Sequence, residues 1–306
     1  MRVSVIIPVY NQAPYLAECL DSVLSQSLRD IEAICVDDGS TDGSGEILDE
    51  YAARDSRVKV IHQANAGAGP ARNAGMDAAT GEFIAFMDPD DKYPDDGVLS
   101  DLLHGAEEKG VDVSGGSLLM MDGRELEPEF MFAADGVLDY SAYQFEYGFY
   151  RYLYRRKLLT GQSIRFPALV RFQDVPFCIE ALHAAGRFYA LKRVVYLYRD
   201  GHHAVEWSAD GGKKALAHVS GLMAAYDLAC RYGYGRMAER LKKRLVDFVE
   251  LLCAESNGLR ADLAITRSHR DSFLGELEDI KSSESYRLGL ALTWPLRKIK
   301  NLMEGK

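Results

Sequence analysis

The chain has 306 residues and a formal net charge of −10, and 47% of its residues are hydrophobic. That is enough chain for one sizeable α/β domain and a smaller second one. The acidic balance, without a basic domain, argues against binding of nucleic acid. The five scattered cysteines include no C-x-x-C pair, so neither a zinc site nor a disulfide framework is indicated, and a reducing cytoplasm is expected.

The N-terminus leads directly into a predicted strand, and the chain contains no run of 18 apolar residues. We therefore expect no signal peptide and no membrane-spanning helix. A cytoplasmic location follows from both expectations.

Three short apolar runs predict strands early in the chain, at residues 3–8, 31–36 and 58–61. Their β-branched residues are typical of strands buried on both faces of a sheet. Each run ends in a polar or glycine-bearing loop: Pro8-Val9-Tyr10-Asn11, Asp37-Asp38-Gly39-Ser40, and Asn65-Ala66-Gly67 after His62. Helical patterns separate the runs, marked by Leu16, Leu20, Val23 and Leu24 and then by Ile47, Leu48 and Tyr51.

The fourth apolar run is the most informative part of the sequence. Residues 83–87 lead into Asp88-Pro89-Asp90-Asp91, so a buried strand ends where three carboxylates emerge together. Strands that alternate with helices predict an α/β fold with a mostly parallel sheet flanked by helices. All four loops then lie at the carboxyl edge of the sheet, where ligands bind in open α/β folds. Together they predict one nucleotide-sized cleft.

The three carboxylates of the 88–91 loop need a positive partner, because close carboxylates repel one another. A divalent metal that holds a diphosphate meets this need, since hard cations take oxygen ligands and complete their shell with substrate phosphates. The alternative is an acidic turn between two elements, because Asp and Pro are ordinary turn residues.

Several kinds of nucleotide site are disfavoured. The sequence has no G-x-x-x-x-G-K-[ST], which argues against a P-loop. The turn after the first strand has no glycine, which argues against a dinucleotide fold and against a sugar nucleotidyltransferase. Gly67-Ala68-Gly69 is a weak glycine motif, because Arg72 stands where the next glycine is expected.

Three motifs carry a resemblance to a known family: VSVIIPVYN, CVDDGSTDGS and ANAGAGPARNAGMDAATGEFIAFMDPDD. In this order and spacing they resemble an inverting family-two glycosyltransferase of the glycosyltransferase-A fold. The motifs cover about the first 100 residues, and weaker similar segments continue to about residue 200.

The resemblance implies how a nucleotide would be held. It implies that Asp38 accepts a hydrogen bond from the base, and a carboxylate there suits the N3–H of uracil or thymine. By resemblance, Pro8 and Tyr10 of the first turn frame the nucleobase. Val9 and Asn11 belong to the same turn and are counted with them among the nucleotide-binding residues.

The resemblance also places Asn65, Gly67 and Arg72 in the loop beside the base and ribose. From the residues alone, two alternatives stay open. Asn11 and Ser40 could cap helices, since both are good capping residues, and Arg72 could be a surface ion-pair partner.

The Asp88-x-Asp90 sequence matches the D-x-D motif of the family. By resemblance, Asp88 faces the ribose, and the last acid binds Mg²⁺ or Mn²⁺ on the diphosphate. Asp91 doubles the last acid, so the metal ligand could be Asp90 or Asp91.

The resemblance makes Asp174 the general base that removes a proton from the acceptor hydroxyl. The family usually has Glu-Asp here, and this chain has Gln173 before the aspartate, which removes one negative charge beside the base. The alternative is that Asp174 caps a helix that starts at Pro176.

Two further segments belong to the expected acceptor half. Residues 143–158 interleave aromatic and basic side chains, and relatives use this region on the acceptor side; most of its residues are expected in the core or on a helix surface. Residues 194–199 predict a strand followed by His202 and His203. One of these histidines could meet the metal or the diphosphate, or the loop could simply be solvated.

The pattern becomes wholly helical from about residue 212, with two apolar stripes. The stripes fit packing on the catalytic domain or on a second copy of the chain. Residues 281–306 contain six Lys or Arg and two Glu, with Trp294 and several leucines. This amphipathic, basic tail fits peripheral contact with anionic lipid at the inner face of the membrane, or a helix docked on the acidic protein.

We therefore expect a catalytic domain over residues 1–205 and a helical C-terminal extension over 206–306. Residues 1–100 would form the nucleotide-sugar-binding half and 101–205 the acceptor half. The expected function is a metal-dependent transfer of a sugar from a UDP-linked donor to a glycan or lipid-linked glycan acceptor in cell-surface polysaccharide synthesis. Two alternatives are a nucleotide-sugar-binding protein without transfer activity and a sugar nucleotidyltransferase.

Overall fold

The computed structural model describes residues 1–124, 126, 128–200 and 211–257. The proposed roles of His202 and His203 and of the basic tail over residues 281–306 lie outside the described residues. The chain divides into two compact units, Met1–Ala204 and Val205–Lys306.

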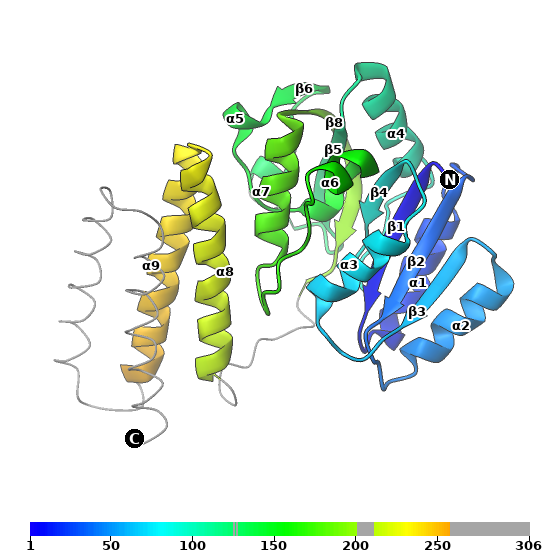
Figure 1. Cartoon of the computed structure of the whole chain (residues 1–306), viewed down its shortest axis with the longest axis horizontal. Helices are drawn as coiled ribbons and strands as arrows, with labels where there is room; N and C mark the ends of the chain where they lie inside the picture. Colours follow the sequence, from blue (N-terminus) through cyan, green and yellow to red (C-terminus); the bar gives the residue numbers. More distant parts are fainter. Residues whose placement is uncertain (125, 127, 201–210, 258–306) are drawn as a thin grey trace. The chain divides into compact units, whose positions relative to one another are not determined.

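The first unit is built on an eight-stranded sheet within the described residues, flanked by helices (Figure 1). The predicted α/β class is confirmed. The strands are β1 Val3–Val9, β2 Ile31–Asp37, β3 Val58–His62, β4 Phe83–Phe86, β5 Val113–Met120, β6 Gly136–Asp139, β7 Tyr152–Arg155 and β8 Arg187–Tyr198. The helices are α1 Ala13–Leu24, α2 Ser44–Arg54, α3 Ala68–Ala78, α4 Val98–Lys109, α5 Tyr140–Tyr143, α6 Arg156–Gly161, α7 Asp174–Ala185, and the short 3₁₀ turns η1 Pro128–Phe130 and η2 Phe149–Arg151.

The strand order is β3-β2-β1-β4-β7-β5-β8-β6. The four N-terminal strands pair in parallel, as predicted. The rest of the sheet is mixed: β7 is antiparallel to both of its neighbours, β5 and β8 are parallel, and β6 is antiparallel to β8. The sheet is therefore parallel only where the predicted nucleotide loops are, and the second half has a different organisation.

The sequence patterns did not predict β5, β6 or β7. Strand β5 contains two adjacent glycines, Gly115 and Gly116, which are depleted in strands. Their lack of side chains is needed here, because a Cβ on Gly115 would lie 2.1 Å from the Tyr152 ring and one on Gly116 would lie 2.3 Å from Val195. Strand β7 lies within the aromatic and basic segment 143–158, much of which is core, as expected.

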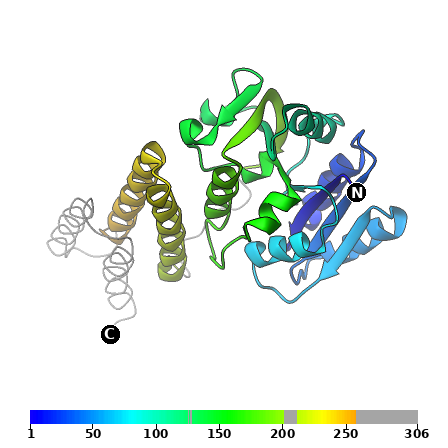
Figure 2. The same ribbon diagram turned by 45° about the horizontal axis from the view of Figure 1, so that its top comes forward.

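Helices cover both faces of the parallel part, with α3 in front of the sheet and α1 behind it in Figure 1, as the turned view in Figure 2 also shows. The apolar stripe of α1 packs in the same core cluster as Val5 and Ile7 of β1. Ile6 points to the other face, where a Cβ on Gly75 of α3 would lie 2.4 Å from it. The alternation along β1 thus fixes one helix on each side of the strand.

The second unit contains α8 Gly211–Arg231 and α9 Gly235–Asn257 in its described part. The two helices pack against each other. Among the residues of their predicted apolar stripes whose side chains are described, Tyr226 is partly buried and the others are buried: Val219, Met223, Met237, Leu241, Leu245 and Phe248.

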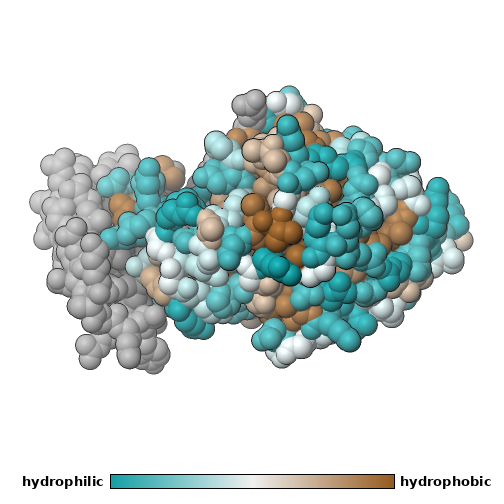
Figure 3. Space-filling model, turned by 90° about the horizontal axis from the view of Figure 1, so that it is seen from above, coloured by the Kyte–Doolittle hydropathy of each residue, from teal (hydrophilic) through white to brown (hydrophobic). Residues whose placement is uncertain are grey.

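None of the helices in the described part of the chain combines the length and apolarity that crossing a membrane requires. Figure 3 shows one face of the molecule, on which the described residues are mainly hydrophilic and the apolar residues form small separate areas.

A buried carboxylate, Glu32 in β2, ties three elements together. Its oxygens accept hydrogen bonds from Ser4 Oγ at 2.6 Å, Lys59 Nζ at 2.6 Å, and the backbone and hydroxyl of Thr80 at 2.8 Å each. Burial alone raises the pKa of Glu32, but these hydrogen bonds outweigh it and lower the pKa from 4.5 to about 2. The ionised carboxylate is therefore stabilised in the folded protein.

This arrangement predicts a pH-dependent contribution of Glu32 to stability. Because its pKa is lower in the folded chain, the stabilisation is fully present above pH 4.5 and is lost as the pH falls towards about 2. The stability gap between wild type and Glu32→Gln, measured by urea unfolding, should therefore shrink over that range. Glu50→Gln, in an exposed helical ion pair with Arg54, is the control and should change stability little. A gap that does not depend on pH would contradict the prediction.

Candidate active site

The loops that follow β1 to β4 meet at one edge of the sheet, as the parallel pairing requires. Backbone hydrogen bonds continue the pairing past the strand ends, from Asp38 N to Val9 O and from Met87 N to Ile6 O. The residues predicted to bind the nucleotide-sugar donor and the acidic loop therefore lie at the same edge of the sheet.

The first two loops are joined by Asn11, whose backbone is left-handed with a φ of 52°. Its N–H donates to Ser40 Oγ at 3.1 Å, and its Oδ1 accepts from the Thr41 N–H at 2.8 Å. Asp42 adds a bond from the N–H of Ala13, in the first turn of α1, to its Oδ2 at 3.0 Å. Asn11 thus holds one loop against the other and does not cap a helix, since Gln12 and Gly43 occupy the N-cap positions of α1 and α2.

Only part of the first turn is open to a ligand. Pro8 and Val9 are buried at the end of β1, while Tyr10 is 48% exposed. The Tyr10 ring is half exposed and precedes Asn11 in the chain, so it can offer a flat face to a planar ligand.

Asp38 is 3% exposed and organises the third loop. Its Oδ1 accepts from Gln63 Nε2 at 2.7 Å and from Ala66 N at 2.9 Å, and its Oδ2 accepts from Gly67 N at 2.7 Å. A carboxylate offers about four acceptor positions, so these three bonds leave one position on Oδ2. Gln63 was not among the residues predicted from the sequence.

Arg72 is a buried residue, 6% exposed, and not a surface ion-pair partner. Its Nη2 donates to Asp88 Oδ1 at 2.6 Å, and its guanidinium lies over the rings of Phe149 and Phe166, 4.8 and 5.3 Å from their centroids. Its Nε and Nη1 are buried without a hydrogen-bond partner. Leaving buried arginine donors unpaired costs free energy. These two N–H groups are therefore available to donate to a bound ligand or to a carboxylate that moves on binding.

The two acids after Pro89 have different environments. Asp91 is 1% exposed, and Tyr196 Oη and the backbone N of Arg199 donate to its two oxygens at 2.8 and 2.7 Å. Burial, with the nearby charges of Asp88 and Asp90, raises the pKa of Asp91. Asp90 is only partly buried.

Asp174 is the first residue of α7, with Gln173 at the N-cap position. Burial raises the pKa of Asp174; the charge of Arg72 opposes this rise and the charge of Asp88 adds to it. Backbone N–H groups of Asp174 and Val175 also lower it, as expected for an acid in the first turn of a helix. Asp174 therefore lies within electrostatic reach of the Arg72–Asp88 pair.

In the part of the chain that the structure describes, no three His, Cys, Asp or Glu side chains form a group that could hold a metal by themselves. The oxygen donors of the 88–91 loop nevertheless fit a hard cation. Mg²⁺ in particular is usually held by one or two carboxylates plus substrate phosphates and water. The residues present fit a metal that arrives with, or is completed by, a diphosphate.

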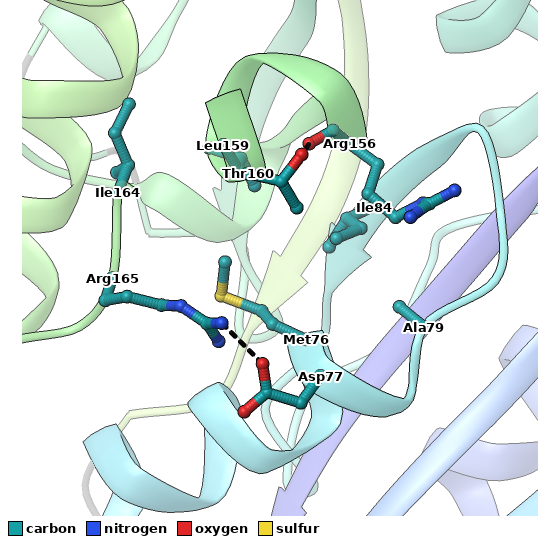
Figure 4. A pocket seen from close by; sticks show the side chains of 9 residues that line it. All are labelled: Met76, Asp77, Ala79, Ile84, Arg156, Leu159, Thr160, Ile164 and Arg165. Carbon is teal, nitrogen blue, oxygen red and sulfur yellow. Dashed lines mark hydrogen bonds and ion pairs between the residues drawn. The ribbon is translucent and has the colours of Figure 1, made fainter. Parts of the chain in front are cut away.

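A separate cavity of about 120 Å³ lies between α3, β4 and α6 (Figure 4). Its lining includes Ile84, Leu159 and the ion pair between Asp77 and Arg165. None of the predicted site residues lines it, and its volume is small for a nucleotide, since ligand pockets usually measure about 300–1,000 Å³.

The sheet, the loop edge and the D-x-D acids define a nucleotide-sugar transferase fold of the glycosyltransferase-A type. Residues 4–175 match the model of the family described as glycosyl transferase family 2. The chain belongs to this family.

Two curated relatives and one solved structure illustrate the similarity. The chain is 38% identical over 215 residues to the "uncharacterized glycosyltransferase EpsJ" of Bacillus subtilis (strain 168), covering 66% of this chain and 62% of that protein. It is 34% identical over 214 residues to the poly(ribitol-phosphate) beta-glucosyltransferase of Bacillus spizizenii, covering 66% of this chain and 33% of that protein. The chain thus spans less than two thirds of these relatives.

The solved structure is S. aureus TarS 1-349 in complex with UDP-GlcNAc, which superposes with a TM-score of 0.62. The sequence identity is 23%, and the match covers 88% of this chain and 78% of that chain. At this identity the likeness shows the shared fold.

The Asp38 contacts predict a specific response of the third loop to Asp38→Asn. The amide would turn an N–H donor towards the N–H of Ala66 or Gly67, and an unsatisfied donor costs about 1–3 kcal/mol. Hydrogen exchange at these two amides should therefore accelerate by roughly tenfold or more. Asp49→Asn, at an exposed carboxylate that contacts His62, is the control. Unchanged exchange at Ala66 and Gly67 would show that Asp38 does not hold the loop.

Proposed function

We propose that the protein is an inverting, metal-dependent glycosyltransferase that moves a sugar from a UDP-sugar to a hydroxyl of a glycan. The observation that carries the proposal is that Asp38, Asp88 and Asp90 follow neighbouring parallel strands at one sheet edge. Asp88 is paired there with Arg72, and the charges of both residues act on Asp174. The domain that would act is residues 1–205, and family membership supports the reaction class.

Asp38 and Tyr10 would bind the base. The remaining acceptor position on Asp38 Oδ2 suits the N3–H of uracil, and the half-exposed Tyr10 ring suits its face. Asn11 would act indirectly, by holding the two loops together. The TarS structure with UDP-GlcNAc supports a uridine donor on this fold.

Asp90 is the residue that we propose to hold Mg²⁺ or Mn²⁺, because it is partly exposed and Asp91 is not. When bound, such a cation would neutralise the charge that develops on the leaving diphosphate. Asp88 would face the ribose while Arg72 holds it in place through their ion pair.

Asp174 would act as the general base. Burial raises its pKa, which increases its affinity for the proton of the acceptor hydroxyl. One base and a direct displacement at the anomeric carbon account for an inverting reaction. Gln173 carries no charge that would add to the rise in the pKa of Asp174, and the charge of Arg72 opposes that rise.

The acceptor is proposed to be a polysaccharide or lipid-linked glycan intermediate at the cell surface. The poly(ribitol-phosphate) beta-glucosyltransferase among the relatives supports a polymeric acceptor. Aromatic residues of the 143–158 segment would contribute to that side, because ring faces stack on sugars. Contact with the membrane or with a second copy of the chain remains a proposal for the C-terminal region.

The metal assignment predicts that Asp90→Ala abolishes metal-dependent binding of UDP but leaves the fold intact. Transfer should fall by roughly 10²-fold or more, since a bound cation supplies several kcal/mol of charge stabilisation. Calorimetry with UDP and Mn²⁺, with and without chelator, measures the binding. Asp96→Ala, at an exposed acid outside the loop, is the control. If chelator and Asp90→Ala both leave transfer unchanged, the metal proposal is wrong.

The base assignment predicts that Asp174→Asn retains UDP binding but loses transfer by ~10²–10⁴-fold, the usual effect of a positioned general base. In the wild type, activity should fall as the pH drops through the raised pKa of Asp174, because a protonated carboxyl cannot accept the proton. Release of UDP from a panel of UDP-sugars with a glycan acceptor measures both effects. Near-normal turnover of the variant would refute the assignment. Release of pyrophosphate from a nucleoside triphosphate would instead indicate a nucleotidyltransferase.

A further inference from the structure

The loop that carries the D-x-D acids is fastened to the end of β8. Tyr196 Oη donates to Asp91 Oδ2 at 2.8 Å and accepts from the backbone N of Asp88 at 3.0 Å. The backbone N of Arg199 donates to Asp91 Oδ1 at 2.7 Å, and its Nε donates to the carbonyl of Asp90 at 2.9 Å. We call Asp91, Tyr196 and Arg199 the Asp91 clasp.

We propose that Asp91 is a positioning residue and not a metal ligand: through the clasp it sets the place of Asp88 and Asp90 for the reaction. The inference deepens the proposed function and rests on it. Both carboxylate oxygens of Asp91 are engaged by donors inside the protein, and the side chain is 1% exposed. Because the side chain is buried, a metal could reach its remaining acceptor positions only if the loop around it opened.

The clasp restrains several successive parts of the loop. The Asp88 N–H donates a hydrogen bond to Tyr196 Oη, and the Asp90 carbonyl accepts one from Arg199 Nε. The backbone of Lys92 next pairs in both directions with Leu197. A loop held at its first, third and fifth residues has little freedom to move its acidic side chains. Positioning of this kind is needed because a small misplacement of a charged group weakens its effect on the transition state.

The clasp also connects the donor loop to the expected acceptor half. The Tyr196 ring is stacked on Tyr150 with centroids 4.4 Å apart, and the partly buried Tyr150 directly precedes the buried Arg151 in the 143–158 segment. Tyr196, itself a residue of the acceptor half, therefore bonds to Asp91 of the acidic loop by its hydroxyl and stacks on Tyr150 of the 143–158 segment by its ring. Its position on β8 makes it a link between the two halves of the site.

The first experiment is a double-mutant cycle with Asp91→Asn, Tyr196→Phe and the double variant. Substitution of a residue that orients a metal ligand usually lowers metal affinity or activity by about 10–100-fold. Each single variant should therefore lower kcat by about tenfold or more at saturating donor and Mn²⁺. The double variant should be no worse than the more affected single variant, because both changes break one unit. Acceptor KM should change little. Tyr198→Phe, on a ring that also lies beside Tyr150, is the matched control and should retain activity.

These measurements are made on folded protein, checked by circular dichroism below the melting transition. A merely structural role would lower the melting temperature and leave kcat of the folded protein unchanged, which would overturn the inference. Fully multiplicative losses would also overturn it. If Asp91→Asn does not fold, Tyr196→Phe decides: it removes one hydroxyl, and wild-type kcat in that variant would refute the clasp.

The second experiment asks directly which acid meets the metal. Thiolate ligands favour soft cations over Mg²⁺ and Mn²⁺. Asp90→Cys should lose transfer with Mn²⁺ and regain at least about tenfold with Cd²⁺, whereas Asp91→Cys should not be rescued. Rescue of Asp91→Cys by Cd²⁺ would make Asp91 a ligand and refute the inference. If neither variant is rescued and chelator has no effect, the metal part of the proposed function fails, while the mutant cycle still decides the clasp.

Discussion

Repulsion among three carboxylates within four residues is the constraint around which this site is organised. The structure gives each acid a different environment. Asp88 is paired with the buried Arg72, and Asp91 is buried with its oxygens bonded to Tyr196 and Arg199. Asp90 stays partly exposed between them. This separation explains how a short acidic loop can be stable in the folded chain and still present one carboxylate to a ligand.

An aromatic cluster beneath the site connects the acidic loop to the proposed base. Phe86 precedes Asp88 by two residues in the chain, and its ring lies 5.3 Å from that of Phe177, which is one helical turn after Asp174. Phe166 stacks on Phe177 at 4.0 Å and also lies under the Arg72 guanidinium. Packing of rigid rings is sensitive to small shifts, so Asp88, Arg72 and Asp174 are held in a common frame.

The N-terminal half could be predicted well because its information is local. Buried parallel strands appear as continuous apolar runs, and each loop must emerge at the same edge. The second half could not be predicted in the same way. Strand β5 has two glycines because Tyr152 and Val195 pack against its backbone, and those partners are distant in the sequence. Two residues that were predicted to bind the nucleotide have a structural role in the folded chain: Val9 is buried, and Asn11 joins two loops.

The sequence alone determined the α/β class, the four parallel strands with their loops, and the family to which the chain belongs, since all of these depend on periodicity and on residues close in the chain. The tertiary structure decided the environment of each acid. Asp90 and Asp91 are adjacent and chemically identical, so no local pattern distinguishes them. The difference comes from Tyr196 and Arg199, more than 100 residues away, whose donors reach Asp91 because β8 lies in the same sheet as β4.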